Sequence, residues 1–270
     1  MTPVFFDTHA HLDFPDFKSD FSGVLERARS SGVSRIIAIG TDLDSSRRAI
    51  MMAEAHDEIF AVAGWHPNHA SEAPEDIRDE LAALAAHPKV VAIGETGIDR
   101  HRLPEPGPGQ PDDLRESLLR RQRRLFQQQL EVACALRLNC VIHQRAALDD
   151  TLEVLQPCLD RTKGVFHCFV DGPAAAQRVL DLGCLVSFTG ILTFKSAADV
   201  RASLAVAPPG KFMLETDCPF LAPMPHRGQR CEPSYVPHIA AVAAQVKGID
   251  IDAISRSTCE AARQFFPRLG

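Results

Sequence analysis

The chain alternates short apolar runs with longer amphipathic segments, and this pattern constrains the fold more than any other feature. The runs have the length and composition of buried strands, and the segments between them have helical spacing. Parallel strands need such crossover connections, and eight repeats close a (β/α)8 barrel. The predicted strands are Val4–Asp7, Arg35–Ile39, Ile59–Ala63, Val90–Ile93, Asn139–Ile142, Gly164–His167, Leu185–Ser187 and Lys211–Glu215. We therefore expect an α/β fold of the TIM barrel type, with a doubly wound sheet as the alternative.

Helical patterns fill the spaces between these strands, and no low-complexity linker interrupts them. The predicted helices are Phe21–Ser31, Ser45–Ala55, Pro74–Ala86, Leu114–Leu136, Ala147–Leu155, Pro173–Leu182 and Ala197–Leu204, with Ser234–Lys247 and Asp250–Phe266 after the last strand. The last two would complete or cap the barrel. The segment from Arg102 to Pro111 is rich in proline and glycine, so we expect a loop there. This loop would border the mouth of the barrel, which is the end where the strands terminate. Residues 1–270 are expected to form one domain.

Composition limits the classes of protein that the chain can belong to. It has 270 residues with 45% hydrophobic content, enough for a large core, and no uninterrupted apolar run long enough to cross a membrane. Its start lacks the pattern of a secretory signal, and its eight cysteines show no Cys-x-x-Cys spacing, so a cytoplasmic location is expected. The net charge of −6 gives no general attraction to nucleic acid. A polyanionic substrate would have to be bound by local cations or metals.

Six side chains of metal-binding types lie at or just after the predicted strands. They are His9, His11, Glu95, His143, His167 and Asp217. His9 and His11 are two positions apart, so both imidazoles leave the first strand on the same side. The active site of a TIM barrel is built at the C-terminal ends of its strands, where all six side chains would meet. One tetrahedral ion needs only four ligands, and Glu95 can bridge two ions, so we expect two divalent metal ions.

Six motifs follow one another along nearly the whole chain. They are Asp7-Thr8-His9-Ala10-His11-Leu12, Gly64-Trp65-His66-Pro67, Gly94-Glu95-Thr96-Gly97-Ile98-Asp99, His143-Gln144-Arg145, His167-Cys168-Phe169 and Glu215-Thr216-Asp217-Cys218-Pro219-Phe220-Leu221, the last continuing to Arg227-Gly228 and Glu232-Pro233. In this order they resemble the motifs of the TatD-like metal-dependent deoxyribonucleases, a family of metallo-hydrolase TIM barrels.

The resemblance implies that His9, His11, Glu95 and Asp217 hold one ion, while Glu95, His143 and His167 hold the other. Asp217 and Glu95 would be the catalytic residues, and Asp217 would orient a water that the ions activate and take up its proton. The mixed imidazole and carboxylate donors suit Zn²⁺ or Mn²⁺, and the family resemblance keeps Mg²⁺ as an alternative.

Three further residues are predicted to bind the substrate. Arg145 could grip a phosphate with its guanidinium, and its alternative role is an ion pair with a neighbouring acid. His66 and Arg227 are the other candidates. The chain departs from the family pattern nearby: Ala146 stands where relatives have an aspartate, Arg100-His101 replaces aromatic residues, and Thr258-Cys259-Glu260 stands where an asparagine is usual. These departures affect the surface that selects the substrate and leave the ligand set intact.

The sequence thus predicts a metal-dependent hydrolase that cleaves phosphodiester bonds of DNA, as a 3′-to-5′ exonuclease with no membrane association. One alternative keeps the site and changes the substrate to an ester or amide, such as an aminoacyl-tRNA ester. A second alternative is a metal-binding scaffold without turnover. A substrate panel combined with the metal content of the purified protein separates the three.

Overall fold

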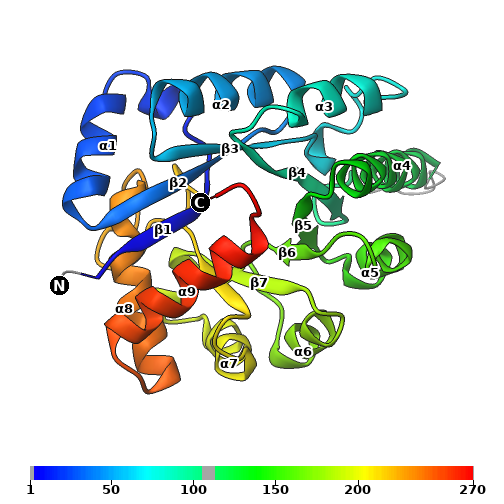
Figure 1. Ribbon diagram of the computed structural model, residues 1–270. Coiled ribbons are helices and arrows are strands. Elements are labelled where there is room, and N and C mark those ends of the chain that lie inside the picture. The colour runs from blue at the N-terminus through cyan, green and yellow to red at the C-terminus, as the bar shows by residue number, and fades with distance from the viewer. Residues whose placement is uncertain (1–2, 105–112, 270) are drawn as a thin grey trace.

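Eight parallel strands surround the centre of the molecule in the order β1 to β8 (Figure 1). The structure is a computed structural model that describes residues 3–104 and 113–269. The strands are β1 (Phe5–Ala10), β2 (Val33–Ile39), β3 (Ile59–Ala63), β4 (Val90–Asp99), β5 (Asn139–Arg145), β6 (Gly164–Phe166), β7 (Leu185–Phe188) and β8 (Phe212–Leu214). A parallel bridge between Ala10 and Cys218 joins the first strand to the segment after the last. The predicted TIM barrel is confirmed.

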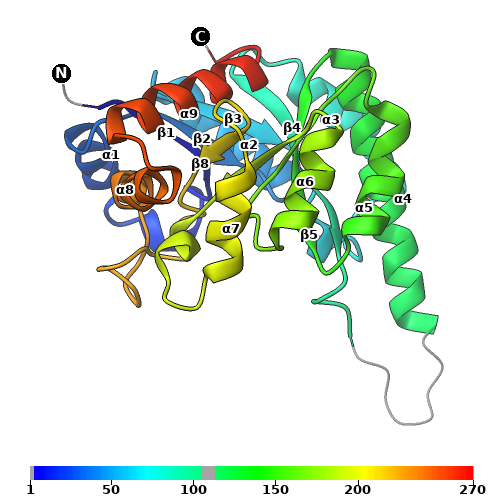
Figure 2. The same cartoon turned by 90° about the horizontal axis from the view of Figure 1, so that it is seen from below.

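Helices connect successive strands and cover the outside of the barrel (Figures 1 and 2). They are α1 (Phe21–Ser30), α2 (Leu43–Ala55), α3 (Arg78–Ala85), α4 (Asp113–Leu136), α5 (Leu148–Leu155), α6 (Pro173–Asp181), α7 (Ala198–Val206), α8 (Val236–Lys247) and α9 (Ile251–Phe265). Asp42 and Asp250 cap α2 and α9 by accepting backbone N–H groups of the first turn, as the N-terminal preference for aspartate predicts. None of the helices in the described residues is both long and apolar enough to span a membrane.

Three strands run past their predicted C-terminal ends and so include candidate ligands. β1 continues to Ala10, β4 to Asp99 and β5 to Arg145, so His9, Glu95 and His143 lie within strands rather than after them. The reason is that the ladder between β4 and β5 resumes after a register shift and pairs Gly97 with His143. Polar residues can continue these strands because their side chains meet one another inside the barrel. These three candidate ligands therefore stand on strand backbone.

One helix begins later than predicted, and one predicted loop is mostly outside the described residues. Helix α3 begins at Arg78, not at Pro74, because the chain after β3 first forms the short 3-10 helix η2 (Pro67–His69). The backbone N–H of Ile77 is bound by the side chain of Gln128 in α4. Most of the predicted loop from Arg102 to Pro111 lies outside the described residues.

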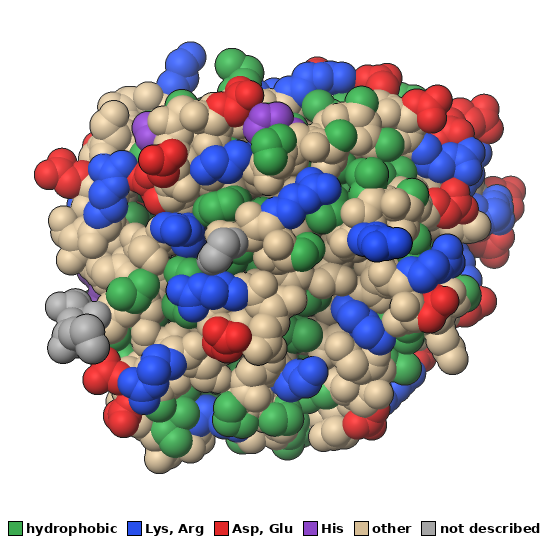
Figure 3. Space-filling view, in the orientation of Figure 1, with side chains coloured by type: hydrophobic (Ala, Val, Ile, Leu, Met, Phe, Trp, Pro, Cys, Tyr) green, Lys and Arg blue, Asp and Glu red, His purple; other side chains and the backbone are tan. Residues whose placement is uncertain are grey.

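Helix α9 closes the end of the barrel where the strands begin, opposite their C-terminal ends. Alternate strand residues such as Ile37, Ile39 and Val62 form one buried cluster with Phe265 and Phe266 from the end of α9. Figure 1 shows α9 lying across this end, and Figure 2 shows it far from the segment that leaves β4. On the surface seen in Figure 3, basic and acidic side chains are interspersed over this face. The prediction that the C-terminal helices cap the barrel is thus confirmed for α9.

Candidate metal centre

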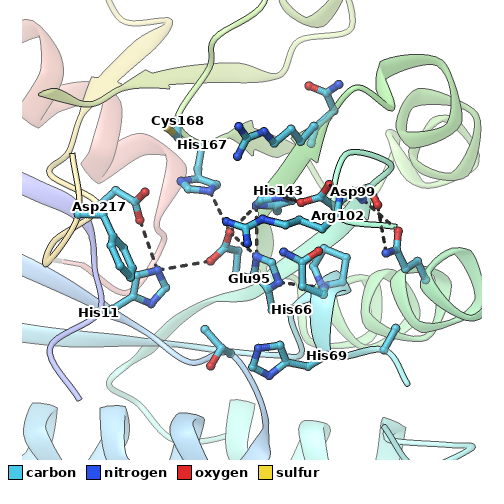
Figure 4. A pocket seen from close by; sticks show the side chains of 18 of the residues that line it. His11, His66, His69, Glu95, Asp99, Arg102, His143, His167, Cys168 and Asp217 are labelled. Carbon is cyan, nitrogen blue, oxygen red and sulfur yellow. Dashed lines mark hydrogen bonds and ion pairs between the residues drawn. The ribbon is translucent and has the colours of Figure 1, made fainter. Parts of the chain in front are cut away.

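Glu95 lies at the centre of the cluster of candidate ligands, and each of its carboxylate oxygens faces a different set of imidazoles. Oε2 is 3.4 Å from His9 Nε2 and 3.7 Å from His11 Nε2. Oε1 is 2.9 Å from both His143 Nδ1 and His167 Nε2. Figure 4 shows Glu95 between His11 on one side and His143 on the other. One carboxylate is therefore shared by two groups of donors.

The first group has the shape of a tetrahedral metal site. His9 Nε2 and His11 Nε2 are 3.3 Å apart, and Asp217 Oδ1 is 3.7 Å and 3.4 Å from them. With the two distances to Glu95 Oε2, five edges of a tetrahedron measure between 3.3 and 3.7 Å. The centre of such a tetrahedron is about 2.1 Å from each corner, which is close to the bond lengths of Zn²⁺ to nitrogen and oxygen.

The second group contains a residue that the sequence assigned to the substrate. His66 Nε2 is 3.3 Å from Glu95 Oε1 and 3.3 Å from His143 Nδ1, so His66, Glu95 and His143 form one cluster of donors. His167 reaches the same oxygen from β6. The sequence could have suggested this role, because His66 lies three residues after β3, at the end of the barrel where the other candidate ligands gather.

Two buried carboxylates hold the imidazoles in place. Asp99 Oδ2 is 3.0 Å from His143 Nε2, which directs the other ring nitrogen of His143 toward Glu95. Glu215 Oε1 is 3.4 Å from His167 Nδ1 and accepts the Cys168 N–H at 2.7 Å. Such contacts fix the orientation of metal-binding histidines. The sequence did not single out Asp99, although it follows Glu95 by four positions in β4 and so faces the same side.

The backbone turns sharply where the strands end at the site. Ala146, Cys168 and Asp217 follow β5, β6 and β8, and all three have positive φ angles, which non-glycine residues seldom adopt. At Asp217 the φ of 58° takes the chain out of strand geometry. Glu215 and Asp217 would face the same side of a continued strand, and this turn gives them different surroundings.

Burial and the mutual contacts of these groups set their protonation. Burial lowers the pKa of His66 to about 4 and also lowers the pKa of His9, so both rings offer a free lone pair. Burial by itself would raise the pKa of Glu95 and Asp217, but the surrounding imidazoles outweigh it and keep both carboxylates ionised. Asp99 follows the same pattern, with the bond from His143 holding its pKa at about 2. Burial alone would lower the pKa of His11, His143 and His167, but their contacts with neighbouring carboxylates outweigh it and raise all three. The centre thus combines ionised carboxylates with imidazoles whose donor nitrogens a bound divalent metal would keep deprotonated.

A pocket of about 790 Å³ opens over these residues. Arg145 and Arg102 line it, and Figure 4 shows Arg102 reaching over the centre. Arg227 is not among the lining residues, and its guanidinium stacks on Phe194 instead. Cys168 also lines the pocket, but burial raises the pKa of its thiol to about 12, which disfavours a nucleophilic role.

The model of the family described as TatD related DNase matches residues 6–267. The chain belongs to the TatD family of metal-dependent hydrolases. It is 36% identical over 264 residues to the uncharacterised metal-dependent hydrolase YabD of Bacillus subtilis, covering 97% of this chain and 99% of that protein. It is 33% identical over 268 residues to a protein of Pantoea ananatis named 3′-5′ ssDNA/RNA exonuclease TatD, covering 97% and 98% of the two chains.

Solved structures agree with this assignment. The crystal structure of YJJV, a TatD homologue from Escherichia coli K12, matches with a TM-score of 0.87 and 30% identity over 99% of both chains. The donor set described above fits the metal dependence of the TatD family, because it supplies imidazole and carboxylate ligands at tetrahedral spacing. The chain is therefore a metal-dependent hydrolase of this family, and the His and Glu clusters of the barrel mouth are its candidate metal-binding groups.

Proposed function

We propose that this protein is a two-metal phosphodiesterase that removes nucleotides from DNA, working from the 3′ end. The observation that carries the proposal is the position of Glu95, whose two carboxylate oxygens face separate donor groups within 2.9 to 3.7 Å. A carboxylate shared between two groups of ligands in this way is typical of hydrolases that use two metal ions. The name of the Pantoea relative supports a nucleic acid as substrate.

Divalent ions at this centre would activate a water and offset the charge that develops on a phosphate during hydrolysis. His9, His11, Glu95 and Asp217 would hold one ion. Glu95, His143 and His167 would hold the other, and His66 is placed to join them.

The protein's own groups supply positioning and proton transfer. Asp217 lines the pocket and its carboxylate stays ionised, so it can accept a proton from an attacking water. Asp99 fixes the ring of His143, and Glu215 does the same for His167. Arg145 lies two positions beyond His143 at the pocket wall and can bind a phosphate oxygen. We retain Zn²⁺, Mn²⁺ and Mg²⁺ as candidate ions, a cytoplasmic location, and residues 1–270 as one domain.

A reconstitution experiment tests the proposal. The purified protein is stripped with a chelator and assayed on single-stranded DNA labelled at its 5′ end, before and after addition of Mn²⁺, Mg²⁺ or Zn²⁺. We expect chelation to abolish cleavage, metal to restore it, and products to shorten from the 3′ end. Glu95→Ala and Asp217→Ala should abolish activity. Full activity in either variant, or in the stripped protein, would contradict the proposal.

The same assay separates the alternative substrates. An aminoacyl ester of tRNA and a simple phosphodiester are tested beside DNA with the metal-loaded protein. Hydrolysis of the ester alone would replace the nuclease proposal with an esterase. Metal binding with no hydrolysis of any substrate would indicate a scaffold.

A further inference from the structure

The two ends of the pocket differ in chemistry. At the end that carries His11 and Asp217, the lining is apolar and includes Phe14, Phe220 and Leu221. At the end that carries Asp99 and His143, it includes Arg102 and Arg145. Figure 4 shows His11 and Asp217 on one side of Glu95 and Asp99 on the other, with Arg102 extending from the Asp99 side toward Glu95. The pocket therefore has an apolar wall and a cationic wall on opposite sides of the metal centre.

The apolar wall includes an aromatic ring that is partly exposed to the pocket. Phe14 packs against the His11 ring with centroids 5.1 Å apart, and Phe220 meets Phe14 edge-on at 5.7 Å. Phe220 is 50% exposed although it lines the pocket. The Phe220 N–H donates to the Asp217 carbonyl, so the ring is held three residues from a ligand. An exposed aromatic face beside a phosphodiesterase centre suits a nucleobase, because every base can stack on it.

The cationic wall is also anchored to ligand residues. Arg145 follows His143 in β5, and the Arg102 N–H donates to Asp99 Oδ1 at 2.9 Å. Neither guanidinium makes a hydrogen bond or an ion pair within the described part of the chain, in contrast to Arg100, which is paired with Asp150. Two unpaired guanidinium groups at one edge of a pocket suit an additional phosphate.

We propose that the two walls set the direction in which a single strand enters: the 3′-terminal nucleoside stacks on Phe220, and the next phosphate on the 5′ side binds Arg102 and Arg145. This inference rests on the proposed function. Its physical reason is the distribution of charge in the substrate. Once the scissile phosphate lies at the metal centre, the terminal nucleoside carries no further charge and suits an apolar wall. The rest of the strand brings a phosphate with each nucleotide and suits a cationic one.

The apolar wall is tested with two oligothymidylates that differ only at the 3′ end, one with a terminal base and one with an abasic residue. We expect the wild-type protein to prefer the base-bearing end by about 10- to 100-fold in kcat/KM. Phe220→Ala should abolish this preference by lowering kcat/KM on the base-bearing substrate more than on the abasic one, while Phe220→Tyr should preserve it. Met51→Ala is the control, because Met51 is exposed on α2 and lies outside the pocket lining. Equal losses on both substrates in Phe220→Ala would overturn the inference.

The cationic wall is tested with two substrates that differ by one phosphate. A dinucleoside monophosphate has only the scissile phosphate, whereas a trinucleoside diphosphate has one more. Arg102→Gln should lower kcat/KM about 10-fold more on the trinucleotide than on the dinucleotide, with Arg102→Lys in between. Arg161→Gln serves as the control, because Arg161 is exposed and does not line the pocket. An equal effect on both substrates would overturn this assignment.

Binding measurements separate a failure of this inference from a failure of the proposed function. The same oligonucleotides, labelled at the 5′ end, are titrated in the presence of Ca²⁺ and followed by fluorescence anisotropy. If wild type hydrolyses none of them, the nuclease proposal is wrong. If wild type binds the base-bearing end more tightly than the abasic end and Phe220→Ala removes this difference, the apolar wall is still supported. Equal binding of both ends would overturn it.

Discussion

At the scale of single residues, the site depends on which atom of each side chain faces the centre. His143 presents Nδ1 to Glu95 because its Nε2 is bound to Asp99 at 3.0 Å. Asp99 is 1% exposed and its pKa is lowered, so it accepts the Nε2 proton of His143 and leaves Nδ1 as the ring nitrogen that would bind a metal. A contact behind the ligand thus determines the donor atom.

The first prediction concerns this contact. Asp99→Asn replaces the acceptor by an amide that can donate to Nε2 of His143, which moves the ring proton to Nδ1. We expect metal affinity or activity to fall about 10- to 100-fold, measured by metal titration and kcat. Asp150→Asn is the control, because Asp150 pairs with Arg100 and Arg123 away from the centre. Unchanged metal affinity and kcat in Asp99→Asn would show that the contact does not orient the ligand.

The second prediction concerns proton transfer at Asp217. Asp217→Asn keeps the size of the side chain and an oxygen that can face a metal, but it removes the basic carboxylate. We expect kcat to fall about 10²- to 10⁴-fold, with a smaller change in metal content. The measurement is kcat on a chromogenic phosphodiester together with metal analysis of the protein. A variant that retains kcat would exclude Asp217 as the base.

At the scale of elements, the strands carry the ligands and the C-terminal helix supports them from the other end. The aligned ladder of β4 and β5 holds Glu95 and His143 on rigid backbone. Gly97 makes this possible, since its φ is 137° and an added Cβ would lie 2.0 Å from the His143 carbonyl oxygen. Helix α9 fills the opposite end with Phe265 and Phe266. The strands thus carry the candidate ligands, whereas α9 stabilises the opposite end of the barrel.

The third prediction follows from α9. Phe266→Ala removes a fully buried ring and should lower the free energy of unfolding by about 3–5 kcal/mol, measured by urea denaturation. Gln264→Ala, an exposed position of the same helix, should change it by less than about 0.5 kcal/mol. Metal stoichiometry should stay the same in both, because α9 lies away from the mouth. A loss of metal sites in Phe266→Ala would contradict this separation.

The fourth prediction concerns the contact between α1 and the 3-10 helix η5 (Pro233–Tyr235). Arg27 donates to both carboxylate oxygens of Glu232, at 2.8 and 2.7 Å. Burial alone would raise the pKa of Glu232, but the bonds from Arg27 and Ser234 outweigh it and lower the pKa. The stabilisation is therefore present above the pKa of the unfolded chain and is lost as the pH falls through the folded-state pKa.

Glu232→Gln should accordingly destabilise the protein by about 1–3 kcal/mol at pH 7, and the difference from wild type should shrink as the pH is lowered below about 4. Urea denaturation at several pH values measures this. Glu260→Gln, an exposed change on α9, provides the comparison. A difference that stays constant with pH would show that the ion pair does not stabilise the fold.

At the scale of the whole molecule, the barrel has one closed end and one open end. The closed end is apolar, whereas the open end gathers carboxylates and imidazoles that are costly to bury without a cation. Metal ions would offset this cost, and any ligand that binds only the folded state stabilises it.

The fifth prediction is that metal stabilises the fold. Adding Zn²⁺ or Mn²⁺ at about 100 times its dissociation constant should contribute about 2.7 kcal/mol and raise the Tm by about 5–10 °C, measured by calorimetry. Glu95→Gln should lose most of this shift, since Glu95 contacts both donor groups. A stripped protein that melts at the same temperature as the loaded one would contradict this expectation.

Local patterns along the chain predicted the barrel and the types of side chain at its mouth. Eight apolar runs with helical connections leave few other architectures, and residues at strand ends must meet at one face once the strands are parallel. This reasoning needs only local periodicity, so it also placed His9, Glu95 and Asp217 in one region.

Only the tertiary structure decided how those side chains face one another. The place of His66 beside Glu95, the role of Asp99 behind His143, and the different surroundings of Glu215 and Asp217 depend on positive-φ turns and on distances between strands far apart in the chain. The contrast between the Phe220 wall and the Arg102 wall likewise arises from loops after different strands. Local patterns predict which residues are present at the mouth of the barrel. The closure of the barrel then determines which of their atoms come within bonding distance.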